Sequence, residues 1–114
     1  MVAVIQFIKG VTETTLADVR LTRSRDQSTG TATFCFKNPD VIFDNYTDIT
    51  GMYLIDDEGI LYTNNVKAIF VDGQPQFIEA LYIMRTLNDW ERFMRFIKCY
   101  GEENQLTFVP ADSK

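Results

Sequence analysis

Histidine is absent from this sequence of 114 residues. Histidine is the side chain most used for acid–base catalysis near neutral pH and is a common zinc ligand, so its absence excludes histidine-based hydrolytic triads. A lysine or a carboxylate could still act as a base. A polar cleft with a strongly perturbed pKa would therefore point back to catalysis, which the composition otherwise disfavours.

Cysteine and long apolar runs are also scarce. The two cysteines, Cys35 and Cys99, form no CxxC pair and no metal knuckle, which predicts free thiols in a reducing compartment. No apolar run approaches the roughly 20 residues of a membrane-spanning helix. The start of the chain, residues 1–10, shows no secretory signal. We therefore expect one domain over residues 1–114 that does not cross a bilayer.

The charge is distributed unevenly along the chain. The net charge of −5 divides into +2 for residues 1–38, −7 for residues 39–79 and 0 for residues 80–114. A chain of this kind presents a positive and a negative region if the fold keeps the segments apart. The acidic total disfavours nucleic acid as a partner, because such binding needs a basic face.

Three arginines nevertheless fall within six residues, at Arg20, Arg23 and Arg25. Two interpretations are open. The cluster, joined by Lys9 if the first strand lies alongside, could dock onto an acidic protein loop or an anionic membrane surface. It could instead be solvated charge at a strand edge, which discourages aggregation. The bunching of basic residues within an acidic chain favours docking.

Alternating apolar residues predict an antiparallel sheet made of hairpins. Three hairpins are expected, with turns at residues 24–30, 57–59 and 72–73. A strand at residues 3–9 is apolar on both sides and is expected to be covered on both faces. Between residues 38 and 51 we expect a loop with one short apolar anchor at Val41–Phe43.

The apolar period then changes to that of a helix. An apolar stripe comprises Trp90, Phe93, Met94, Ile97 and Tyr100. Asn88 is the expected N-cap, with Glu91 in the capping-box position, and Gly101 the expected end. Residues 106–109 could add a strand before a frayed tail at residues 110–114.

Other helix residues lie off this stripe. Projection places Arg92, Arg95 and Cys99 on the opposite face, where Cys99 is expected to be an inert surface thiol. Phe96 falls at the margin and is assigned to the core.

The carboxylates Asp56, Asp57 and Glu58 form an acidic cluster at one turn. They lack the ligand spacing of a calcium-binding loop, so a solvated turn is preferred to a calcium site. The fold class that these patterns predict is α+β: a mainly antiparallel sheet, folded towards a sandwich, with one amphipathic C-terminal helix packed on it.

Four stretches in order, "RLTRSRD", "GTATFCF", "GMYLIDDEG" and "WERFMRFIKCY", resemble the photosystem II assembly protein of the Psb "twenty-eight" family, also called the reaction-centre W protein. The resemblance covers nearly the whole chain. Gln27, Ile60 and the two cysteines depart from the family's pattern, which suggests a divergent paralogue.

The resemblance implies a non-catalytic factor without a cofactor of its own. It would bind transiently to photosystem II assembly intermediates on the cytoplasmic or stromal side of the thylakoid membrane and be soluble when released. The implied partners are photosystem II core subunits, above all the inner-antenna chlorophyll protein, together with the membrane surface. Arg20, Arg23 and Arg25 stand in the family's arginine motif.

A rival function from another class is a general adaptor or regulatory binding module that forms a weak homodimer and has soluble partners. A hairpin-rich sheet would permit either function, and co-sedimentation with thylakoid membranes would separate them.

Overall fold

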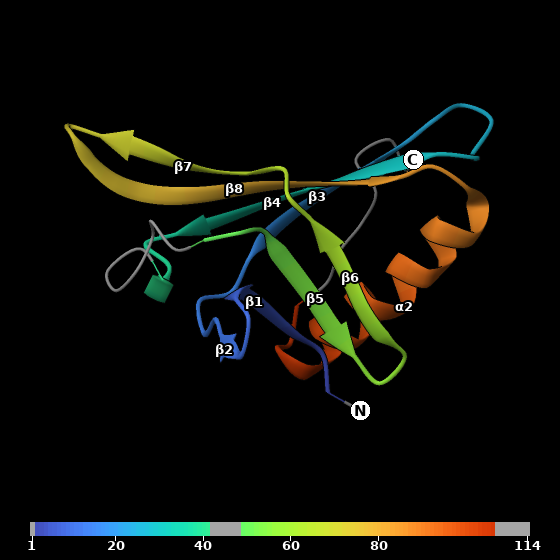
Figure 1. Ribbon diagram of the computed structural model, residues 1–114. Helices are drawn as coiled ribbons and strands as arrows, with labels where there is room; N and C mark the ends of the chain where they lie inside the picture. Colours follow the sequence, from blue (N-terminus) through green and yellow to red (C-terminus); the bar gives the residue numbers. More distant parts are fainter. Residues whose placement is uncertain (1, 42–48, 107–114) are drawn as a thin grey trace.

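The structure, a computed structural model, describes residues 2–41 and 49–106. In this part of the chain it consists of two four-stranded antiparallel sheets and a long helix (Figure 1). The first sheet has the order β2-β1-β5-β6 and the second sheet the order β3-β4-β8-β7. The elements are β1 (Val4–Ile8), β2 (Val11–Thr12), β3 (Asp18–Arg23), β4 (Gly30–Lys37), β5 (Met52–Asp56), β6 (Gly59–Thr63), β7 (Val66–Val71), β8 (Gln74–Met84) and α2 (Leu87–Glu103). The α+β fold expected from the sequence is confirmed.

All three expected hairpins are present, as β3–β4, β5–β6 and β7–β8. Strand β4 pairs with β8 from Gly30 opposite Met84 to Lys37 opposite Phe77, so two of the hairpins form one continuous sheet. The β5–β6 hairpin instead pairs with β1. In Figure 1 the β7–β8 hairpin reaches past the end of β4, and the β5–β6 hairpin lies below it in the other sheet.

The β7–β8 turn has the backbone geometry that its residues favour, whereas the β3–β4 turn does not. Asp72 and Gly73 have φ angles of 53° and 80°, which are the positive values that a two-residue turn needs to match the twist of its strands. In the β3–β4 turn Gln27 also has a positive φ of 63°. This left-handed conformation is strained for a side chain such as glutamine.

The helix begins two residues earlier than expected. Thr86, not Asn88, is the N-cap: its hydroxyl accepts a hydrogen bond from the N–H of Asp89 at 3.1 Å. The carboxylate of Asp89 accepts from the N–H of Arg85 in return. The earlier start is favoured because Thr86 has the extended backbone (φ −137°, ψ 164°) with which β8 runs directly into the cap.

The helix also ends later than expected. Gly101, the expected end, lies inside the helix on its buried face, and the helix continues to Glu103. The N–H of Leu106 donates to the carbonyl of Gly101 at 2.7 Å, and Gln105 has a φ of 59°. This is a Schellman cap with a glutamine in the left-handed position usually taken by glycine. Leu106 packs on the core and closes the end of the helix. The further strand and the frayed tail expected after it fall outside the described residues, from residue 107 onwards.

The core lies between the inner faces of the two sheets and the helix. The rings of Phe7 and Phe36 meet edge to face at 4.9 Å between centroids, which joins the first sheet to the second. Phe34 and Phe93 meet in the same way at 6.1 Å, which joins the second sheet to α2. Phe96 is 0% exposed, so its assignment to the core is confirmed.

Two expectations about burial were wrong. Strand β1 is covered on one face only: Ile5 and Phe7 are buried, whereas Gln6 on the other face is half-buried and bonds to Thr12 of the neighbouring strand β2. Cys99 is buried rather than on the surface, because the start of the chain packs against the last turns of α2. Burial raises the pKa of the Cys99 thiol, which stays protonated and unreactive.

The expected loop after β4 is fastened by a buried carboxylate. Val41 is buried, as expected for the apolar anchor, whose remaining residues lie outside the described part. Glu13 accepts hydrogen bonds from the N–H groups of Asp40 at 2.7 Å and Val41 at 3.2 Å. Asp40 in turn accepts from Thr14, so the two segments hold each other through reciprocal hydrogen bonds.

Candidate docking surface

The three clustered arginines do not share one face of β3. Strand alternation places Arg20 on the outer, exposed side, opposite Thr33 of β4. Arg23 lies at the end of the strand, opposite Gly30, and its side chain is on the inner side. Arg25 is exposed in the turn that follows. The charges therefore point in different directions, although they are close in sequence.

Arg23 is engaged inside the protein. Its guanidinium lies over the ring of Trp90, 4.5 Å from the ring centroid, and donates to the carbonyl of Gln27 at 2.9 Å. Gly30 lies on the strand beside Arg23, where a Cβ atom would come within 2.4 Å of the Trp90 ring. The tryptophan thus fits between a cation and a glycine, and Arg23 helps to fix the start of α2.

The turn that carries Arg25 is held by one carboxylate. Asp26 accepts hydrogen bonds from the hydroxyls of Ser24 and Ser28, each at 2.7 Å, and from the N–H of Ser28 at 3.0 Å. These hydrogen bonds, led by that from the Ser28 hydroxyl, lower the pKa of Asp26 to about 2. The turn is therefore a hydrogen-bonded unit that presents Arg25 to solvent.

Lys9 does not join the arginines. It is exposed in the turn between β1 and β2. The neighbours of β1 are β2 and β5, so β1 is in the first sheet whereas β3 is in the second. The condition for a shared patch, that the first strand lies alongside the arginine strand, is not met.

The structure adds Arg85, which the sequence reasoning missed. Gly30 pairs with both Arg23 and Met84, so the end of β3 and the end of β8 share one end of the second sheet. Arg85 directly follows Met84. We call Arg23, Arg25 and Arg85 the basic end of the second sheet. Only the pairing of β4 with β8 brings Arg85 there, and no local pattern in the sequence indicates it.

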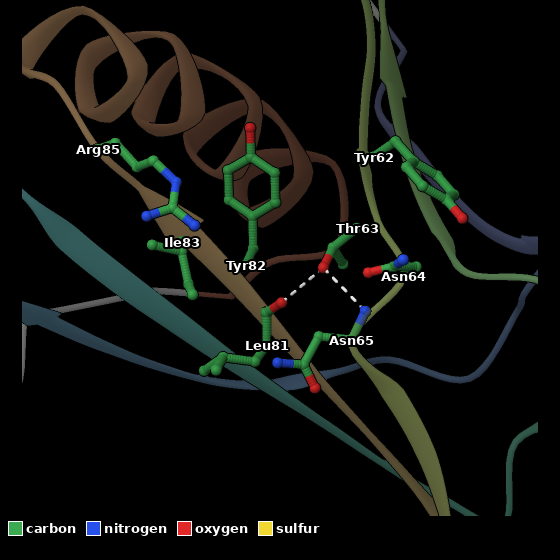
Figure 2. Close-up of a pocket in the computed structure, with 8 residues that line it drawn as sticks. All are labelled: Tyr62, Thr63, Asn64, Asn65, Leu81, Tyr82, Ile83 and Arg85. Carbon is green, nitrogen blue, oxygen red and sulfur yellow. Dashed lines mark hydrogen bonds between the residues drawn. The ribbon is translucent and has the colours of Figure 1, made fainter.

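A hollow of about 430 Å³ lies beside Arg85, between the end of β6 and the end of β8. It is lined by Tyr62, Thr63, Asn64, Asn65, Leu81, Tyr82, Ile83 and Arg85, as Figure 2 shows. The hydroxyl of Thr63 donates to the carbonyl of Leu81 at 2.8 Å and accepts from the N–H of Asn65 at 3.1 Å. The first of these hydrogen bonds joins the end of β6 to β8 beside the hollow.

In the acidic turn between β5 and β6, Asp57 and Glu58 are exposed, as expected for a solvated turn, but two of the three carboxylates also bind α2. Asp56 accepts two hydrogen bonds from Arg92, at 2.7 and 2.9 Å, and Glu58 two from Arg95, at 2.7 and 3.0 Å. Burial alone would raise the pKa of Asp56, but hydrogen bonds from Arg92 and from the backbone of Glu58 and Gly59, with the charge of Arg92, together hold it below its usual value. Both helix arginines are therefore used to clasp the turn to the helix.

Residues 2–41 and 49–106 contain neither a cluster of metal ligands nor a helix that could span a membrane. No group of three or more potential metal-binding side chains comes together there. No helix in the described part of the chain is long and apolar enough to span a membrane. Two side chains of the second sheet have raised pKa values. Burial is the main cause for both the Tyr82 hydroxyl and the Cys35 thiol.

Comparison with known proteins gives the family. The family described as "Psb28 protein" matches residues 5–108. A relative from Guillardia theta named "Photosystem II reaction center Psb28 protein" is 59% identical over 114 residues, covering 97% of this chain and 98% of the relative. Proteins with the same name from Thalassiosira pseudonana (58% over 114 residues; 97% and 100% covered) and Synechococcus elongatus (54% over 112 residues; 97% and 100%) are similar over the same extent. The resemblance noted from the four sequence stretches is confirmed, and the chain belongs to the Psb28 family.

Proposed function

We propose that this protein is a non-catalytic assembly factor of photosystem II. It binds transiently to assembly intermediates at the cytoplasmic or stromal face of the thylakoid membrane, beside the inner-antenna chlorophyll protein, and protects the immature reaction centre. The observation that supports the proposal most strongly is the family match over residues 5–108, with relatives named after the photosystem II reaction center.

The proposed contact uses basic side chains that the fold leaves free. Arg20 and Arg25 are exposed, whereas Arg23 supports the Trp90 packing behind them. Each basic residue near an anionic membrane surface contributes about 1 kcal/mol. Lys9, in the other sheet, would make a separate contact with the membrane or the partner. Acidic loops of the partner would be attracted by the same charges.

The second part of the proposed mechanism is addition of a partner strand to an open sheet edge. Edge strands β3 and β7 carry charged side chains, and β2 has only two residues. Strand β6, Gly59–Thr63, has no charge and no proline, and it exposes Ile60 and Tyr62. An edge without such protection is the one best suited to pair with another chain. A partner loop that pairs with β6 would be held in its extended conformation, because binding favours the conformation that fits the edge.

The first experiment is an affinity pull-down of the tagged protein from solubilised thylakoid membranes, with mass spectrometry of the recovered proteins. Recovery of the inner-antenna protein and reaction-centre subunits without oxygen-evolving subunits is expected. Recovery of soluble proteins alone would contradict the proposal and support the adaptor function.

Charge reversal tests the arginine contact. The double variant Arg20→Glu, Arg25→Glu is expected to lose binding to these membranes, because both side chains are exposed and the folded core does not use them. The double variant Lys37→Glu, Lys98→Glu, which makes the same change in net charge at two other exposed sites, is the matched control. Equal binding by both variants would refute the contact.

Hydrogen exchange in the complex tests strand addition. The amides of β6 are expected to exchange more slowly when the partner is bound, because edge N–H groups gain hydrogen-bond acceptors. Unchanged exchange along β6, with a complex present, would rule the mechanism out.

A further inference from the structure

We infer that the hollow between β6 and β8 is a recognition pocket for a carboxylate carried by an extended acidic segment of the partner. The inference rests on the proposed docking to photosystem II and specifies which chemistry the partner must present. It depends on three features of the hollow: unused hydrogen-bond donors, a positive charge and two strand ends with open edges.

The hollow is rich in donors that the fold does not use. Within residues 2–41 and 49–106 the Arg85 guanidinium makes no hydrogen bond or ion pair, and only its backbone N–H is bonded, to Asp89. The side-chain amides of Asn64 and Asn65 likewise have no partner in the described part of the chain, although their backbones are bonded. Unused donors around a hollow favour a ligand group that only accepts hydrogen bonds, and a carboxylate is such a group.

The charges around the hollow also suit an anion. Arg85 is the one ionisable side chain among the eight lining residues apart from the tyrosines. Asp89 lies nearby, but its carboxylate is bound to the N–H of Arg85 and belongs to the cap at the start of α2, where the helix dipole compensates its charge. In Figure 2 the Arg85 side chain lies on one side of Tyr82 and the asparagines lie on the other. A carboxylate is thus the group that Arg85 could bind through two parallel hydrogen bonds.

The backbone around the hollow suits an extended chain. Strand β6 is the last strand of the first sheet. Strand β7 pairs with β8 only as far as Ala80, so among the described strands residues 82–84 of β8 have a neighbour on the β4 side alone. Both strand ends border the hollow. A segment that pairs with β6 would therefore carry its side chains past Arg85 and the asparagines.

The test uses photosystem II assembly intermediates solubilised from thylakoid membranes as the probe. The full chain carrying p-benzoylphenylalanine in place of Ile83, an exposed lining residue without a side-chain donor, is irradiated in the complex, and the cross-linked peptide is identified by mass spectrometry. Arg85→Glu and Arg85→Lys are compared with wild type in titrations at several salt concentrations. Lys98→Glu serves as a control for the change in net charge. Because Arg85 is exposed and its side chain is unbonded, these variants are expected to keep the thermal midpoint of the wild type.

The expected result is a cross-linked segment with a carboxylate within about three residues of the attachment point, since neighbouring side chains on one face of a strand are two residues apart. Arg85→Glu should weaken binding by about tenfold or more, and Arg85→Lys should retain most of it. Equal binding by Arg85→Glu and Lys98→Glu, or a captured segment without a carboxylate, would overturn the pocket while leaving the proposed function standing. Failure of the wild-type protein to bind the intermediates would overturn both.

Discussion

The clasp between the β5–β6 turn and the helix allows a quantitative prediction, because its two bidentate ion pairs differ in burial. Arg92 binds Asp56 through Nη1 and Nη2, and Arg95 binds Glu58 through Nε and Nη2. A weaker contact of 3.7 Å between Nε of Arg92 and Oε1 of Glu58 links the two pairs. The side chains of Arg92 and Asp56 are 18% and 4% exposed. Those of Arg95 and Glu58 are 56% and 36% exposed. Each arginine donates two hydrogen bonds to its carboxylate. The two pairs therefore differ mainly in how far water screens them.

We expect Asp56→Asn to lower the free energy of unfolding by about 2 kcal/mol, somewhat below the cost of breaking a fully buried pair, since the amide oxygen keeps one hydrogen bond. Glu58→Gln should cost no more than about 0.5 kcal/mol, because exposed pairs contribute little. In a domain of this size 2 kcal/mol corresponds to a fall in Tm of roughly 8 °C.

The pH dependence follows from the direction of the pKa shift. Burial raises the pKa of Asp56, but the hydrogen bonds and charge of Arg92 and the backbone N–H groups of Glu58 and Gly59 together outweigh it and leave the pKa below its ordinary value of 3.8 in the folded protein. The folded state therefore favours the ionised carboxylate. The ionised carboxylate stabilises the folded protein in full at pH values above the pKa of Asp56 in the unfolded chain. This stabilisation is lost as the pH falls through the lower pKa of Asp56 in the folded protein. Asp26, with a pKa of about 2, loses its contribution in the same direction.

Urea unfolding followed by tryptophan fluorescence measures these effects, because Trp90 is buried in the core. The difference in unfolding free energy between wild type and Asp56→Asn should be constant near neutral pH and shrink below about pH 4. The same titration on Asp26→Asn separates the contribution of the β3–β4 turn. If Asp56→Asn and Glu58→Gln cost the same at pH 7, or if the difference does not shrink in acid, the argument from burial is wrong.

Three further predictions concern the backbone and its caps, each measured by the change in Tm and in urea midpoint. Gly30→Ala should destabilise the protein by about 2 kcal/mol, because its Cβ atom would overlap the Trp90 ring; an unchanged Tm would show that the ring can move aside. Gln105→Gly should stabilise by about 0.5 to 1 kcal/mol, since glycine relieves the left-handed conformation at a modest entropic cost; a loss of stability would contradict the strain. Thr86→Ala should cost about 1 kcal/mol and Asn88→Ala almost nothing, since Thr86 is the N-cap; the reverse order would restore the cap expected from the sequence.

Local sequence patterns predicted the strands and hairpins. They could not predict which strands from different hairpins pair with each other. Alternation and turn residues identified all three hairpins, because a turn such as Asp72-Gly73 is determined by its own residues. The pairing of β4 with β8 depends on the shared core, so Arg85 could not be assigned to the basic end of the second sheet from the sequence.

The errors on the helix have the same origin. Thr86 and Asn88 each precede an acidic residue by three positions, so two capping boxes compete in the sequence. The connection from β8 decides between them. Helical projection assumes that one side of a helix is covered, and Cys99 was misplaced because the start of the chain covers a second side. Arg92 and Arg95 were correctly placed opposite the apolar stripe, but their partners on the β5–β6 turn lie too far away in sequence to be identified.

The same reasoning explains why basic residues gather near the β3–β4 turn of an acidic protein. Burying Trp90 at the start of α2 needs a glycine beneath the ring and a flat cation above it, which Gly30 and Arg23 supply. Arg92 and Arg95 are bound to carboxylates, so neither can attract a partner without releasing the turn. Arg20, Arg25 and Arg85 make no ion pair with another side chain in the described part of the chain. Apart from Lys37, which is exposed at the far end of β4, the unpaired positive charge of the second sheet thus lies at the end where Gly30 pairs with Met84 and on the outer face, and a partner with acidic loops would approach from there.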